Sequence, residues 1–291
     1  MIPSGSPTVR RRRLAAELRR LRGSRTGGFV ASALGWSPAK ISRYELGQTS
    51  FPLDEVEKLL DFYGVTEPRR SLLLALAADA NERGWWQDYA DVLSTGYMEF
   101  IGLEAEAISS AEWQAESVPG LLQTEDYARE VIRAYQGVVR IPPGHVDRRT
   151  RVRMIRQRIL TDRDPPLELS VVIDESVLLR KVGGREVMFA QLRDLARMAD
   201  LPNIELRVLP LERDTSLMAD PFLVLGFGEQ HETSEIGDVV SAESQSTELY
   251  IEGETDTYLY RLIHQALVDA SLPPDRSRHL ILQTAQRVWG N

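Results

Sequence analysis

The sequence predicts an α+β protein, in which an all-helical N-terminal domain precedes a larger mixed α/β domain. Three observations lead to this class. The chain has 291 residues, enough for one small domain and one of about 200 residues. Apolar residues recur at helical spacing, with glycine breaks, up to about residue 82. Beyond residue 167, several segments alternate apolar and polar residues, as strands do. We expect domains at residues 1–82 and 83–291.

Composition limits the classes of protein. Hydrophobic residues make up 43% and charged residues 27% of the chain, as in ordinary globular proteins. The chain has no cysteine, which excludes disulfides, thiolate catalysis and cysteine-ligated metal. No apolar run reaches the roughly 18 residues that a transmembrane helix needs, and no apolar signal-peptide segment follows the N-terminal arginines. We therefore expect a cytoplasmic protein.

The first helix is expected at about residues 8–22, and it is strongly basic. Leu14, Leu18 and Leu21 form an apolar stripe at helical spacing. Residues 1–50 hold ten Lys/Arg and two acidic residues, so their net charge is +8 while residues 51–291 carry −16. A basic end on an acidic protein suggests nucleic-acid binding, although a disordered basic tail is the alternative. The residues predicted to contact phosphates are Arg10, Arg11, Arg12 and Arg13.

Residues 26–47 predict two short helices joined by a tight turn. Gly35 follows the apolar face of the first helix, as a C-cap needing a left-handed backbone does. Ser37 and Pro38 supply an N-cap hydroxyl and a proline at the first position of the next helix. Because a recognition helix contacts bases with its N-terminal residues, we assign base or adjacent backbone contacts to Ser37, Ala39, Lys40 and Arg43. Helix pairs around a glycine also occur in many other helical proteins.

Two more helices are expected at residues 53–63 and at about 67–82. The second is apolar nearly all round, which predicts that it is sandwiched between the two domains. A tryptophan pair, Trp85 and Trp86, follows it. The pair suggests either ligand stacking or, as the favoured interpretation, packing at the domain junction.

The chain from residue 98 to about 135 is predicted to be mostly helical, and residues 146–161 form a second basic helix. Its arginines favour a solvated or acid-paired helix face, with a second DNA surface as the alternative. Strands are then expected at residues 167–173, 204–209 and 222–227, and one or two more at residues 238–242 and 247–251. Helices are expected at residues 186–199, 254–270 and 274–289.

The sequence gives no support for catalysis. The four histidines are scattered and form no metal-binding pair, and neither a phosphate-binding Gly-Lys-Ser/Thr loop nor a Gly-x-Ser-x-Gly elbow is present. Asp174 and Glu175 at a strand end form a carboxylate pair, for which helix capping is favoured over acid/base or cation chemistry. We therefore expect no enzyme, no cofactor and no metal.

Residues 12–64 resemble the lambda-repressor-like, Xre-type helix-turn-helix domain of bacterial regulators. That resemblance implies five packed helices, of which the third is the recognition helix. The family often has a glutamine at the start of the second helix, which touches the DNA backbone or supports a recognition-helix side chain. This chain has Gly27 there, followed by Gly28. Two glycines weaken the start of a helix by roughly 1 kcal/mol each.

The rest of the chain resembles the actinobacterial domain of unknown function DUF5753, whose members are also called Scr1-like antitoxin-type transcriptional regulators. The similar segments are Trp85–Tyr89, Val118–Arg129, Asp174–Gly184 and Met188–Leu192. The resemblance implies a transcriptional regulator, often accompanied by a small DUF397-like partner protein. The chain departs from the usual pattern at residues 231–250.

We therefore expect a sequence-specific DNA-binding transcriptional regulator that acts as a homodimer on a double-stranded operator. Its C-terminal domain would dimerise and bind a partner protein or an unknown small ligand. Two alternatives stay open: an antitoxin-like protein that mainly sequesters a small partner, and a ligand-binding domain with accessory DNA binding. Candidate ligand or partner residues are Trp85, Trp86, Trp113, Asp174 and Glu175.

Overall fold

A computed structural model gives the structure of the protein, and it describes residues 7–134, 142–212, 219–228, 237–243 and 248–290. The described residues divide into two compact units. The first contains residues 7–87 and 99–106, and the second contains the remainder. The predicted domain boundary after residue 82 stays a prediction.

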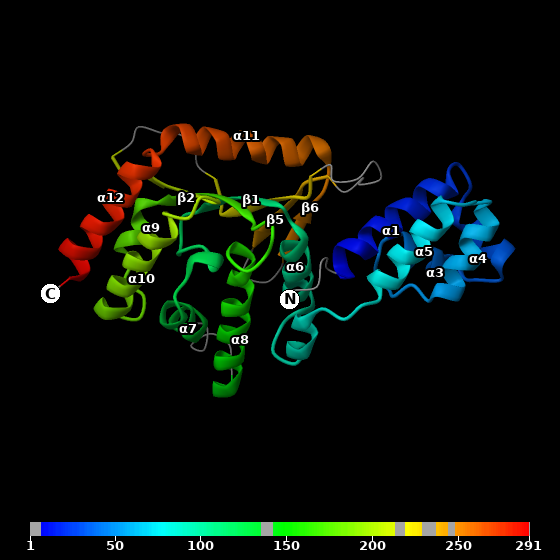
Figure 1. Cartoon of the computed structure of the whole chain (residues 1–291), viewed down its shortest axis with the longest axis horizontal. Coiled ribbons are helices and arrows are strands. Elements are labelled where there is room, and N and C mark those ends of the chain that lie inside the picture. The colour runs from blue at the N-terminus through cyan, green and yellow to red at the C-terminus, as the bar shows by residue number, and fades with distance from the viewer. Residues whose placement is uncertain (1–6, 135–141, 213–218, 229–236, 244–247, 291) are drawn as a thin grey trace. The chain divides into compact units, whose positions relative to one another are not determined.

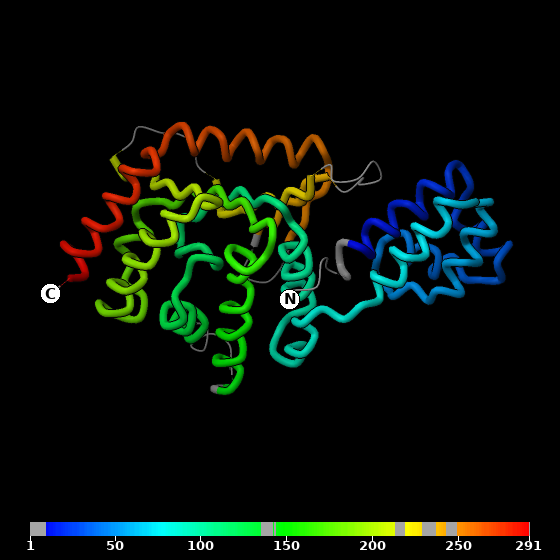
Figure 2. The backbone as a smooth tube through the Cα atoms, viewed as in Figure 1, coloured from blue at the N-terminus to red at the C-terminus, as the bar shows by residue number. Residues whose placement is uncertain are grey.

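The first unit is a bundle of helices, seen in blue to cyan in Figure 2. Every helix predicted from the spacing of apolar residues is present, and the glycine breaks fall where expected. Its first five helices are α1 (Pro7–Arg22), α2 (Gly27–Leu34), α3 (Pro38–Glu45), α4 (Leu53–Tyr63) and α5 (Arg69–Ala80).

Apolar residues from each of the five helices form one core. Leu14, Val30, Ile41, Leu60 and Ala77 are at most 2% exposed and belong to a single cluster. A buried carboxylate, that of Glu17 on α1, accepts hydrogen bonds from Arg20 at 3.0 Å and from Arg69 on α5 at 2.5 Å. Because a buried charge is costly without partners, both arginines stabilise this carboxylate, and the bond from Arg69 joins α5 to α1.

The second unit is built on a six-stranded mixed sheet in the order β3-β2-β1-β4-β5-β6. The strands β1, β2 and β3 run parallel, whereas β4, β5 and β6 add to the other side of β1 in antiparallel fashion. This mixed sheet confirms the predicted fold class. The strands are β1 (Ser109–Gln114), β2 (Glu168–Asp174), β3 (Ile204–Leu209), β4 (Phe222–Gly226), β5 (Val239–Glu243) and β6 (Glu248–Ile251).

Helices cover both faces of this sheet. Figure 1 shows α11 across one face and α7, α8 and α10 on the other side. Short 3-10 turns connect several of them. The 3-10 helix η1 (Trp85–Tyr89) and α6 (Thr95–Glu106) each contain residues of both units. The helices of the second unit are α7 (Glu125–Ala134), α8 (Pro143–Arg156), α9 (Glu175–Leu179), α10 (Arg185–Met198), α11 (Glu254–Ala270) and α12 (Pro274–Thr284).

Residues 98–134 are mostly helical, as predicted, but they also contain the central strand β1, which was not predicted. Its sequence, Ser-Ser-Ala-Glu-Trp-Gln, has no β-branched residue, and it buries Ser110 and Glu112. Pairing with β2 and β4 on both sides supplies the hydrogen bonds, so tertiary context determines this strand more than propensity does.

The basic residues of α8 are used inside the second unit. Arg148 pairs with Asp91, Arg149 donates to the Val92 carbonyl at 2.6 Å, and Arg153 donates to Gln123 at 2.9 Å. These partners agree with the favoured interpretation of the basic stretch as a paired face. None of the described helices is long and apolar enough to cross a membrane.

Candidate nucleic-acid interface

The turn between α2 and α3 has the local geometry that its sequence predicts. Gly35 adopts a left-handed conformation (φ +68°) and ends α2. The Ser37 hydroxyl then accepts a hydrogen bond from the Lys40 backbone N–H at 3.2 Å, with Pro38 at the first helical position. This cap satisfies one of the free N–H groups at the start of α3 and fixes the direction in which the helix leaves the turn.

One face of α3 is buried and the opposite face is exposed. Ile41 and Tyr44 point into the core at 2% and 3% exposure. The exposed residues recur at helical spacing and lie on the other side of the helix. They are Pro38, Ala39, Ser42, Arg43 and the C-cap residue Leu46.

Lys40 does not belong to the exposed face. Its Nζ lies 2.7 Å from Glu55 Oε1 on α4 and 4.2 Å from the centre of the Trp36 ring. The side chain is 26% exposed. An ion pair together with a cation–π contact holds the ammonium group at the flank of α3, away from the position predicted for a base contact.

Glu55 also accepts a hydrogen bond from the Tyr44 hydroxyl. Burial first, and then this hydrogen bond, raises the pKa of Tyr44, so the phenol stays protonated. Burial alone would raise the pKa of Glu55, but hydrogen bonds from Lys40 and Tyr44 outweigh it, and the pKa of Glu55 is lowered. Glu55 is therefore an ionised acceptor shared by two residues of α3, which fixes α3 against α4.

Arg43 is the cation that α3 presents to its exposed side. No ion pair joins its guanidinium to a carboxylate within the described parts of the chain. Ala39 is exposed one turn before it, and Ser37 is exposed although its hydroxyl is used in the cap. A free guanidinium on such a helix can donate two hydrogen bonds to guanine.

The four arginines predicted to contact phosphates lie within the folded helical unit. Arg10 Nη1 is 3.2 Å from Glu82 Oε2, and Arg11 Nε donates to the Ala80 carbonyl at 2.9 Å. Arg12 pairs with Glu99, and Arg13 lies among partly buried residues. These contacts give the cluster an internal role, and its phosphate contacts stay a prediction. The alternative of a disordered tail does not apply to Arg10–Arg13, which lie inside α1.

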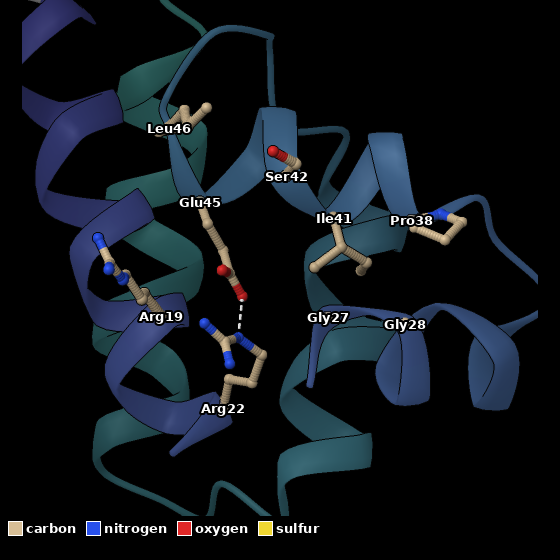
Figure 3. A pocket seen from close by; sticks show the side chains of 9 residues that line it. All are labelled: Arg19, Arg22, Gly27, Gly28, Pro38, Ile41, Ser42, Glu45 and Leu46. Atoms are coloured by element: carbon tan, nitrogen blue, oxygen red, sulfur yellow. Dashed lines mark hydrogen bonds and ion pairs between the residues drawn. The ribbon is translucent and has the colours of Figure 1, made fainter. Parts of the chain in front are cut away.

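A pocket of about 250 Å³ lies beside α3, between the end of α1 and the start of α2. Figure 3 shows Arg22 and Glu45 facing each other across it, and their Nε and Oε1 atoms are 2.6 Å apart. Arg19, Gly27 and Gly28 also line the pocket. Arg19 is exposed. The first backbone N–H groups of α2 also lie at this pocket, and such groups favour an anion. The start of α2 beside α3 therefore suits a phosphate.

Comparison with known families assigns both parts of the chain. Residues 97–283 match the family described as a domain of unknown function, DUF5753. The chain belongs to the DUF5753 family. Residues 13–73 match a family described as a helix-turn-helix domain, which supports a DNA-binding regulator. Neither the curated proteins nor the solved structures contain a significant match.

Three of the predicted ligand or partner residues lie in the DUF5753 region, and all three have internal contacts. Trp113 is 4% exposed, and its Nε1 donates to the Ala219 carbonyl at 2.9 Å. Asp174 accepts from the Ser176 backbone N–H at 2.9 Å and caps α9. Glu175 accepts from the Leu211 backbone N–H at 2.9 Å. These contacts favour packing and helix capping over ligand chemistry.

The other two candidates, Trp85 and Trp86, belong to the first unit. Their rings meet edge to face at 5.8 Å. Trp86 is 4% exposed and lies against the backbone of Gly84, where a side chain would collide with its ring. Packing within the first unit therefore accounts for Trp86, and a ligand role for this pair stays a prediction.

No group of three or more His, Asp or Glu residues that could hold a metal ion is present among the described residues. His231 lies outside them. Sequence reasoning missed Glu55 as a partner of Lys40. Its position on the α4 face toward α3 could have been found from the helical spacing, but its pairing depends on how α3 and α4 cross.

Proposed function

We propose that the protein is a sequence-specific transcriptional regulator that binds its operator through α3 as a homodimer. The observation that carries the proposal is the exposed face of α3, which presents Arg43 unpaired on a helix capped and oriented by Ser37. The net charge of +8 on residues 1–50 supports attraction to phosphates. The DNA target implies that the protein acts in the cytoplasm.

Within this proposal, the predicted contact residues have different roles. Arg43 and Ala39 contact base edges, and Ser37 orients the helix. Lys40 mainly stabilises the position of α3 through its contacts with Glu55 and Trp36. Arg19 and the start of α2 contact the DNA backbone, because they line the pocket at the edge of α3.

Dimerisation is proposed because one helix-turn-helix buries little surface and such proteins bind paired half-sites about one helical turn apart. We assign this role to the DUF5753 domain. The same domain would receive the regulatory signal, either a partner protein such as a DUF397-like protein or a small ligand. A signal acts by preferring one spacing of the two DNA-binding helices over another.

Fluorescence anisotropy tests the proposal. The protein is titrated onto the DNA upstream of its own gene and onto a scrambled duplex, across a salt series. We expect tight, salt-dependent binding that prefers the upstream DNA. Arg43→Ala should weaken binding by about 1–3 kcal/mol and reduce the preference. Equal, weak binding of the wild-type protein to both duplexes would contradict sequence-specific recognition.

A further inference from the structure

The exposed face of α3 has an uneven chemistry along its length. Pro38 and Ala39 at its N-terminal end carry no side-chain hydrogen-bonding group. Ser42 and Arg43 follow one turn later, and Leu46, which is 58% exposed, ends the face. This face carries no carboxylate, so nothing on it repels the acceptor-rich edge of a DNA groove.

The small apolar end of α3 identifies what it can recognise. The major groove presents hydrogen-bonding atoms on every base pair, but an exposed methyl group only on thymine. Alanine and other apolar side chains contact that methyl, whereas arginine donates to O6 and N7 of guanine. We propose that α3 recognises a thymine by its 5-methyl group through Ala39, and a guanine through Arg43. This inference rests on the proposed function.

The spacing of the two residues sets the spacing of the two bases. Ala39 and Arg43 are four residues apart on one helix, which is about 6 Å along its axis. Successive bases on one strand lie about 3.4 Å apart. The thymine and the guanine should therefore lie about two base-pair steps from each other in each half-site.

Lys40 does not supply a second guanine contact, although it lies between the two. Its Nζ is 2.7 Å from Glu55 and 4.2 Å from the centre of the Trp36 ring. Moving it into a groove would leave Glu55 without its cation partner. The half-site thus contains one guanine contact from α3, and the methyl contact supplies the second recognition element.

Selection from a random 30-bp duplex library, followed by base-analogue substitution, tests the inference. In the enriched duplex, each thymine is replaced singly by deoxyuridine, which lacks the methyl group, and each guanine by 7-deazaguanine, which lacks N7. With the wild-type protein, we expect one thymine per half-site whose replacement weakens binding by about three- to tenfold. Replacement of one guanine about two base-pair steps away should weaken binding about tenfold or more.

Variants assign each loss to a residue. The Ala39→Gly variant should bind the duplex with deoxyuridine at that thymine as tightly as it binds the unmodified duplex. The Arg43→Ala variant should likewise bind the duplex with 7-deazaguanine as tightly as the unmodified one. Ala75→Gly on the exposed side of α5 carries a comparable cost in helix stability and should keep the wild-type pattern.

The outcomes separate this inference from the proposed function. A library without enrichment would contradict both. Enrichment in which no thymine depends on its methyl group, or in which Ala39→Gly retains the full loss, would overturn the methyl recognition and leave sequence-specific binding intact.

Discussion

At the scale of single residues, the two cations of α3 differ by their neighbours. Lys40 has a carboxylate at 2.7 Å and an aromatic ring at 4.2 Å, whereas Arg43 points outward from the same helix. The sequence places both at positions suited to DNA contact, and only the crossing of α3 and α4 distinguishes them. A charged residue within a helix-turn-helix can therefore support the recognition helix and make no direct contact with bases.

We expect Lys40→Ala to lower stability more than it lowers DNA affinity. The substitution leaves Glu55 without its cation and removes the contact with Trp36, which together cost about 1–2 kcal/mol. Urea unfolding of the variant measures this loss. Binding to the upstream DNA should weaken by less than about 1 kcal/mol if residual unfolding is corrected for. Arg43→Ala is the control with the reverse pattern, and a Lys40→Ala variant of unchanged stability with lost specificity would contradict the assignment.

Glu106 predicts a pH dependence of stability. Burial raises its pKa from 4.5 to about 7, although Arg13 and Arg10 act to lower it, and its buried Oε1 has no hydrogen-bond partner among the described residues. The folded protein holds the Glu106 proton more tightly than the unfolded chain does. The contribution of Glu106 to the free energy of unfolding therefore falls as pH rises from 4.5 to about 7.

Glu106→Gln removes the ionisation, so the variant should be more stable than wild type at pH 8 by about 1–3 kcal/mol and nearly equal at pH 4.5. Urea unfolding at both pH values measures the difference. Glu57→Gln, at an exposed position on α4, is the control and should change little at either pH. Equal effects of the two substitutions would show that Glu106 does not ionise at an unfavourable site.

At the scale of elements, most of the helical unit could be predicted from the sequence. Spacing of apolar residues, the glycines at C-caps and the Ser37-Pro38 pair are local signals, and local interactions decide these helix ends. The same holds for β3, whose sequence alternates cleanly. The central strand β1 could not be predicted, because its polar residues become buried only once β2 and β4 lie on both sides. The pairs Lys40–Glu55 and Glu17–Arg69 escaped prediction for the same reason, since each joins different helices.

The start of α2 should tolerate a better helix former. Gly28 has an ordinary right-handed backbone, and a Cβ placed there would meet nothing within 4 Å. Gly28→Ala should therefore raise stability by about 0.5–1 kcal/mol, because alanine loses less conformational entropy on folding. Thermal unfolding measures the gain. Gly35→Ala is the contrasting substitution, and it should destabilise because its φ is +68°.

At the scale of the whole molecule, the dimer proposed for DNA binding needs a surface on the DUF5753 domain. α11 has three large apolar side chains on its outer side, where Tyr258, Leu259 and Leu262 are 61%, 53% and 49% exposed. Their spacing puts them on one stripe of the helix. The other side of α11 packs on the sheet through Leu267, which is fully buried. A second copy of the chain would remove this stripe from water.

If α11 forms the dimer contact, Leu262→Asp should convert the dimer to a monomer, because an aspartate at the centre of an apolar contact must be desolvated without a partner. Sedimentation equilibrium of the full chain measures the mass. Leu72→Asp on α5, where the leucine is 63% exposed, is the control and should leave a dimer.

A monomeric variant should also bind its operator more weakly, since two linked DNA-binding domains bind paired half-sites with a raised effective concentration. A wild-type monomer would contradict the homodimer itself, whereas a Leu262→Asp dimer would place the contact elsewhere on the chain.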